Sequence, residues 1–134
     1  MRILALALIA YTGVMLVIHF SSWKLLQKWA GAEDLWASRW FSAQVALRVE
    51  AVYWLLVLAM WPLWPSAGWK ALVVVFAVIH LGAWAAGELR NVREGGLPAL
   101  PTKARRFVVG FDLVEAVALA AIAWIAVVQA LRVA

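Results

Sequence analysis

The chain has 134 residues, of which 67% are apolar and 14% are charged, and it contains no cysteine. A soluble domain carries about a quarter charged residues and about 45–50% apolar residues, so the surplus apolar surface here indicates contact with a lipid bilayer. This composition excludes a disordered chain, a disulfide scaffold, thiolate metal sites and covalent c-type haem. The net charge of +5 does not indicate a nucleic-acid partner, because the basic residues flank apolar runs.

Four apolar stretches are long enough to cross a bilayer core about 30 Å thick, which takes about 20 helical residues. They cover residues 3–20, 45–64, 69–87 and 107–131. The Pro65-Ser66-Ala67-Gly68 segment between the second and third stretches predicts a tight turn between antiparallel helices. The sequence therefore predicts one all-α integral membrane domain, residues 1–134, with four transmembrane helices in an antiparallel bundle.

Two longer connections, residues 22–43 and 88–106, differ in composition. In the first, leucines and tryptophans recur near helical spacing between charged residues, which predicts an interfacial amphipathic helix between the first two spans. The second contains Gly95-Gly96, Pro98 and Pro101, which predicts an irregular loop. Nine of the 12 lysines and arginines lie in or beside these connections. Because cytoplasmic segments are enriched in basic residues, we expect both connections in the cytoplasm and both termini outside a bacterial inner membrane.

Five ionisable side chains lie inside the predicted spans: His19, Glu50, His80, Asp112 and Glu115. Charged groups in hydrocarbon cost a few kcal/mol each on insertion scales, so they usually face the interior of a helix bundle. Counted from the predicted cytoplasmic edge at 1.5 Å per residue, all five lie roughly 6 to 12 Å deep. The sequence therefore predicts one polar layer to which all four helices contribute.

Aromatic side chains accompany this layer. Trp54, Trp84 and Phe76 each stand one helical turn from one of its members, and Tyr53 adjoins Trp54. Pockets that combine apolar walls with a few convergent polar groups are the usual ligand sites of proteins. We therefore expect these four residues to line a site for a lipophilic ligand, for which a cyclic compound is one option.

The sharpest functional hypothesis is acid–base catalysis on that ligand, of the isomerase or cyclase type. A carboxyl group in an apolar pocket tends to keep its proton and can donate it, and an imidazole nearby can take a proton back. Tryptophan rings can stabilise a developing carbocation. In this interpretation Glu115 or Asp112 is the acid and His80 is the base, with Glu50 and His19 completing the catalytic set.

Other functions remain open at this point. The polar layer can be purely structural, because polar pairs join membrane helices with about 0.6 to 2 kcal/mol each. An accessory or anchor subunit of a membrane complex is the main alternative, with quinone or a b-type haem bound between His19 and His80. The predicted depths of these two histidines in the membrane differ by about four residues, or roughly 6 Å. A small transporter is a further alternative.

No metal ligand is predicted from the sequence. A non-haem site would use His19, His80, Glu50 and Asp112, but the Glu-x-x-His spacing of di-iron bundles is absent. Apart from the haem alternative, no cofactor is expected.

Small residues in the third and fourth spans predict close helix contacts. The third span contains Gly82-x-x-x-Ala86 and Ala83-x-x-x-Gly87, and the fourth is rich in alanine between residues 116 and 126. These faces suit packing within the bundle, against a second copy, or against a partner membrane subunit. The expected partners are thus the lipid bilayer, a lipophilic small molecule and membrane helices.

The order of these features is similar to that of one known group of membrane proteins. Four spans, a first connection rich in tryptophan and lysine, and Arg48-Val49-Glu50 near the start of the second span resemble the DoxX-type small membrane proteins. This resemblance covers most of the chain, and it carries no functional residue across.

Overall fold

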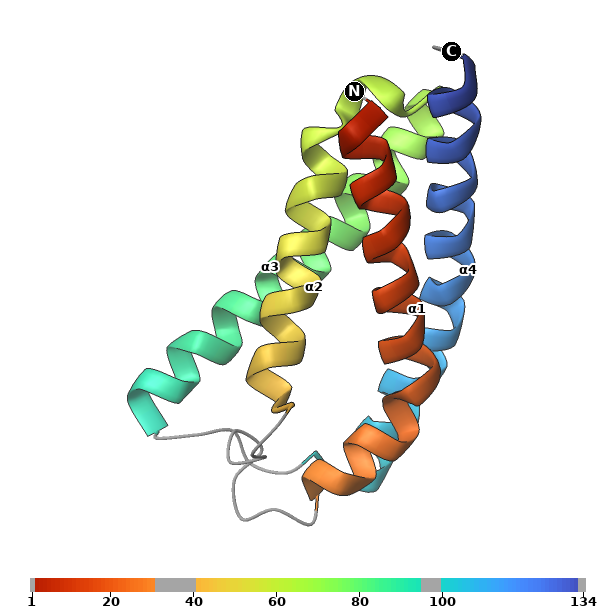
Figure 1. Ribbon diagram of the computed structural model, residues 1–134. Helices are drawn as coiled ribbons and strands as arrows, with labels where there is room; N and C mark the ends of the chain where they lie inside the picture. The colour runs from red at the N-terminus through yellow and green to blue at the C-terminus, as the bar shows by residue number, and fades with distance from the viewer. Residues whose placement is uncertain (1, 31–40, 95–99, 133–134) are drawn as a thin grey trace.

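The computed structural model describes residues 2–30, 41–94 and 100–132, and this part of the chain is all-helical (Figure 1). The predicted all-α class is confirmed. The elements are, in chain order, α1 (Arg2–Ala30), α2 (Ala43–Ala59), the 3-10 turn η1 (Trp61–Leu63), α3 (Ala67–Glu94) and α4 (Thr102–Arg132). By length and composition, α1, α3 and α4 are each able to cross a membrane, which indicates a membrane protein.

The second predicted span, residues 45–64, is an α-helix followed by a 3-10 turn. Ser42 caps the start of α2, because its hydroxyl accepts a hydrogen bond from the Val45 amide at 3.2 Å. After Ala59 the chain passes into η1, which contains Pro62. Proline has no amide hydrogen and disfavours a continued α-helix. The 17 residues of α2 therefore cover roughly 25 Å, which is shorter than the other three helices.

Both long connections begin as helix, which corrects the predicted boundaries. α1 continues unbroken to Ala30, so residues 22–30 extend the first helix and do not start a separate interfacial helix. The remainder of that predicted helix, residues 31–40, lies outside the described residues. α3 likewise continues to Glu94, and α4 begins at Thr102, so much of the predicted loop is helical. The reason is local, since residues 22–30 and 88–94 contain no glycine or proline.

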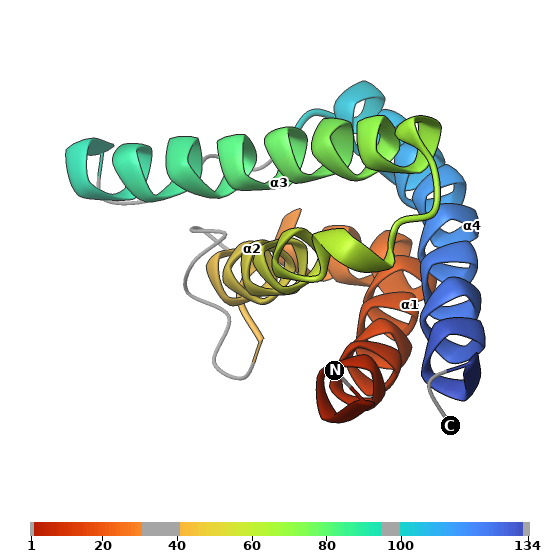
Figure 2. The same cartoon turned by 90° about the horizontal axis from the view of Figure 1, so that it is seen from above.

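The helices form two pairs, with α1 along α4 and α2 along α3 (Figures 1 and 2). The pairs meet where α1 contacts α2, and η1 also contacts α4. Figure 1 shows that the pairs lie closest where α1 begins and α4 ends, and that they move apart toward the opposite end.

A buried apolar core joins the two pairs. Its largest fully buried aliphatic members are Leu8, Met15, Val57, Met60, Val73, Leu119 and Ile122. The Tyr53 hydroxyl lies 3.0 Å from that of Thr12, and the Tyr11 hydroxyl donates to the Val49 carbonyl at 2.7 Å. These hydrogen bonds connect α1 to α2 inside the core.

The outward faces of the helices are apolar as well. Val117 is 72% exposed and Trp124 is 68% exposed, and large apolar side chains are exposed on all four helices. A helix that is apolar all round belongs either in a protein core or in a membrane. Because these residues are on the outside of the described chain, they are suited to contact lipid.

Candidate functional site

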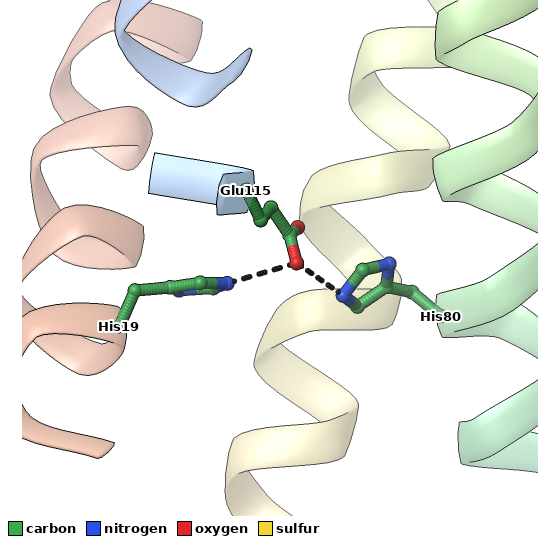
Figure 3. Close-up of side chains that lie close together, drawn as sticks. All are labelled: His19, His80 and Glu115. Carbon is green, nitrogen blue, oxygen red and sulfur yellow. Dashed lines mark ion pairs between the residues drawn. The ribbon is translucent and has the colours of Figure 1, made fainter. Parts of the chain in front are cut away.

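Three buried side chains from three helices meet at one point (Figure 3). The Nε2 atom of His19, on α1, lies 3.1 Å from Oε2 of Glu115, on α4. The Nε2 atom of His80, on α3, lies 3.0 Å from the same oxygen. Glu115 has no exposed surface, and both histidines are buried. We refer to His19, His80 and Glu115 as the histidine–glutamate triad.

The orientation of each histidine is set by its own helix. Nδ1 of His19 lies 2.8 Å from the carbonyl oxygen of Met15, and Nδ1 of His80 lies 2.7 Å from that of Phe76. A carbonyl oxygen only accepts hydrogen bonds, so both Nδ1 atoms carry a proton and donate it. In a neutral imidazole the lone pair is then on Nε2, and both Nε2 atoms face Glu115.

The triad leaves polar atoms without hydrogen bonds. Within the described residues, Nε2 of His19 and both carboxylate oxygens of Glu115 are buried and have no partner with hydrogen-bond geometry. An unpaired buried polar group costs about 1–3 kcal/mol, and more if it is charged. Two nitrogen lone pairs and a carboxylate oxygen face one another here, so this arrangement requires a cation between them, either a proton or a metal ion.

The triad is also the group of residues in the described chain that could hold a metal ion. One potential ligand atom from each of His19, His80 and Glu115 lies within 4.8 Å of the other two. The sequence offered no local spacing for such a site, because each ligand comes from a different helix.

Aromatic rings support His80. Trp54 is fully buried and stacks on His80, with ring centroids 5.4 Å apart and an interplanar angle of 26°. The other predicted neighbour, Phe76, stacks on Trp54 at 5.4 Å and 7°. The ring centroid of Phe111, on α4, lies 6.1 Å from that of His80, and this neighbour was not predicted from the sequence. The available signal was its position one helical turn before Glu115, on the same face of α4.

The other two predicted aromatic residues have different surroundings. Tyr53 is fully buried beside Trp54, edge to face at 5.4 Å, and therefore supports Trp54 from the core. Trp84 donates its indole N–H to Glu88 at 3.1 Å, and Glu88 is also paired with Arg48 at 2.6 Å. Trp84 thus belongs to a polar contact between α2 and α3, one helical turn away from His80.

A cavity of about 670 Å³ lies between the two helix pairs, toward the end where they move apart. Its walls are largely apolar and come from all four helices, with Ile18, Leu26, Leu47, Ile79, Phe107 and Phe111 among the lining residues. The four aromatic residues that were expected to line a ligand site, Tyr53, Trp54, Phe76 and Trp84, are not among its lining residues. Its polar lining residues are Ser22, Glu50, His80, Arg90 and Asp112. Ligand sites typically measure about 300–1,000 Å³ and have this mixture of walls.

The five predicted ionisable residues therefore fall into two overlapping groups. His19, His80 and Glu115 form the triad, whereas Glu50, His80 and Asp112 line the cavity. His80 belongs to both groups. Glu50 and Asp112 line the cavity, whereas His19 and Glu115 are not among its lining residues.

Comparison of the chain with protein families, with curated proteins and with solved structures finds no match. The resemblance to the DoxX-type proteins stays a prediction.

Proposed function

We propose that this protein is a four-span antiparallel membrane bundle whose cavity faces the cytoplasmic side of a bacterial inner membrane, with both termini outside. The fourth span is α2 together with η1. Basic residues near the wide end of the bundle support this orientation, since the end of α1 carries Lys28, the end of α3 carries Arg93, and α4 begins near Lys103. Cytoplasmic flanks of membrane helices are enriched in such residues.

Within this bundle, the cavity binds a lipophilic molecule that carries a polar group. The observation that supports this function is the combination of about 670 Å³ of largely apolar space with the carboxyl groups of Glu50 and Asp112 in its lining. An isoprenoid or quinone-like ring has both the apolar body and the polar substituent that such walls would accommodate.

The sharper form of the proposal is acid–base isomerisation of this ligand. Both nitrogens of His80 face protein atoms, Nδ1 the Phe76 carbonyl and Nε2 the Glu115 carboxylate, so the base role falls to Glu50 or Asp112. One carboxyl group donates its proton to a double bond of the ligand. The other, as carboxylate, removes a proton from a neighbouring carbon, so the double bond moves and the ligand keeps its composition.

A bulky side chain in the cavity is expected to remove the ligand. Ala83 lines the cavity and Ala85, on the same helix, does not. We expect Ala83→Trp to reduce the amount of copurified lipophilic compound at least tenfold, because the indole occupies its space. Ala85→Trp is the matched control and should retain the compound. The measurement is mass spectrometry of organic extracts from equal amounts of purified protein, and equal yields from both variants would contradict the proposed site.

Acid–base chemistry is expected to exchange ligand hydrogen for solvent deuterium. When the protein is incubated in D2O with the extracted compound, carbon-bound deuterium should enter the ligand, because the donated proton comes from a solvent-exchanged carboxyl group. Glu50→Gln and Asp112→Asn should each slow incorporation by about 100-fold or more, within the range that general acid–base groups contribute. Mass spectrometry of the recovered ligand measures this. If the wild-type protein binds the ligand but no deuterium enters it, the proposed catalysis is ruled out and the proposed ligand binding is not.

The alternative role, an accessory subunit in a membrane complex, is favoured by one surface. On α3, Gly82, Ala85 and Ala86 are exposed, and a Cβ atom added at Gly82 would meet nothing within 4 Å. On α4, Ala116 and Ala126 are buried within the chain and Ala120 is exposed, so the exposed small residues are fewer there than on α3. A partner helix or a second copy would therefore pack on α3, and crosslinking through cysteines introduced at Ala85 or Ala86 tests this role.

A further inference from the structure

We infer that the histidine–glutamate triad binds one divalent transition-metal ion, of the class that Zn²⁺ represents, through Nε2 of His19, Nε2 of His80 and the carboxylate of Glu115. This inference does not depend on the proposed ligand, because a metal ion can be measured in the protein without it.

The distances within the triad fit a common ion. Zinc binds histidine nitrogen at about 2.0–2.1 Å and carboxylate oxygen at about 2.0–2.2 Å, so two ligands at a tetrahedral angle are about 3.4 Å apart. The two Nε2 atoms lie 3.1 and 3.0 Å from Oε2 of Glu115. Shifts of a few tenths of an ångström therefore convert these two contacts into ligand–ligand separations around one ion. Potential ligand atoms of all three residues lie within 4.8 Å of one another, so the two histidine rings would have to approach each other by at most about 1.4 Å to complete the site.

The hydrogen bonds that the Nδ1 atoms of both histidines donate are of the kind that metal-binding histidines usually make. A metal-binding histidine usually donates its second ring N–H to a carbonyl or carboxylate, which sets the tautomer and orients the ring. Here the Nδ1 atoms of His19 and His80 donate to the carbonyl groups of Met15 and Phe76. Both lone pairs are thereby directed at Glu115 before any ion is bound.

An ion also supplies the partners that the triad lacks. In the described chain, Nε2 of His19 and both oxygens of Glu115 are buried without hydrogen bonds. A single proton placed between Glu115 and one histidine satisfies one of the two nitrogen contacts, and a proton on each histidine would satisfy both. One divalent ion binds all three residues at once with the same net charge as those two protons. A metal ion is therefore the simpler cation for this geometry.

The same geometry favours a compact ion over haem. Oε2 of Glu115 lies about 3 Å from both histidine nitrogens, so it fills the space beside them that a porphyrin plane would need. Three protein ligands leave a further coordination position, which holds water or substrate in catalytic zinc sites. Because His80 also lines the cavity, the ion would lie next to its wall.

The test uses the untagged full chain in detergent, because a polyhistidine tag would bind metal itself. The protein is stripped with a chelator, loaded with Zn²⁺ and desalted, and we expect one zinc per chain. X-ray absorption at the zinc edge should show imidazole scattering from two histidines. The chain has two histidines and no cysteine, so this signal reports His19 and His80 directly. Folded wild-type protein that retains no zinc, or zinc without imidazole scattering, would overturn the inference.

Variants then locate the site. Glu115→Gln and His19→Ala should each weaken Zn²⁺ binding more than tenfold, because even outer-shell substitutions cost about 10–100-fold in metal affinity. Glu94→Gln is the control, since Glu94 is an exposed carboxylate paired with Arg90 at 3.5 Å, and it should leave the affinity unchanged. Unchanged affinity in both triad variants would place zinc elsewhere and refute the site. If these variants do not fold, the wild-type stoichiometry and scattering still decide the question.

Discussion

Replacement of Glu115 by alanine is expected to lower the free energy of unfolding by about 3–5 kcal/mol, the range found when one partner of a buried ionic contact is removed. Glu115 is fully buried and is the residue that both His19 and His80 face at Nε2. Its loss leaves the Nε2 atoms of two buried imidazoles without a partner and opens a void beside α4. Unfolding in detergent, followed by helical circular dichroism, measures the change.

The matched control for this prediction is Glu94→Ala. Glu94 is also a glutamate that faces a basic residue, but its side chain is 51% exposed, so we expect a change within about 0.5 kcal/mol. The loss of unfolding free energy for Glu115→Gln should lie between those for Glu115→Ala and Glu94→Ala, because glutamine keeps the volume and one acceptor oxygen. Similar unfolding curves for Glu115→Ala and Glu94→Ala would show that the triad contributes nothing to stability.

Replacement of Trp54 by alanine is expected to cost about 3–5 kcal/mol of unfolding free energy, as is typical for buried tryptophan. The ring is fully buried and stacks on both Phe76 and His80. We expect Trp54→Phe to cost much less, because phenylalanine keeps an aromatic ring and removes an indole N–H that has no hydrogen-bond partner in the described residues.

The control for the tryptophan series is Trp124→Ala. Trp124 is 68% exposed on the outside of α4, so the substitution should change stability little in detergent. Equal losses for Trp54→Phe and Trp54→Ala would contradict the role of ring stacking beside His80. The same unfolding measurement applies to all three variants.

The three helices that are long and apolar enough to cross a membrane, α1, α3 and α4, could be predicted from the sequence because hydropathy over about 20 residues is a local property of the chain. Their ends were less accurate, since we ended each helix where the apolar run ends. The helical backbone instead continues through residues 22–30 and 88–94, which contain charged or polar residues but no glycine or proline. Hydropathy reports contact with lipid, whereas helix length also depends on backbone propensity.

The composition of the candidate site was predicted better than its contacts. The depth count placed His19 and His80 about four residues apart, yet both lie within 3.1 Å of one oxygen of Glu115. Trp54 was chosen for its spacing from Glu50, yet it stacks on His80 of another helix. Spacing along one helix identifies residues that share a face, but it contains no information about which neighbouring helix that face meets.

By itself, the sequence determined an all-helical chain with helices long and apolar enough to cross a membrane, and the small set of ionisable residues inside it, because both follow from composition and from runs of apolar residues. Only the tertiary structure separated that set into a buried triad and a carboxyl-lined cavity. The rotation and divergence of the two helix pairs decide which side chains meet, and these depend on packing between helices distant in sequence. A cluster of three potential metal ligands, with one residue on each of three helices, is visible only at that level.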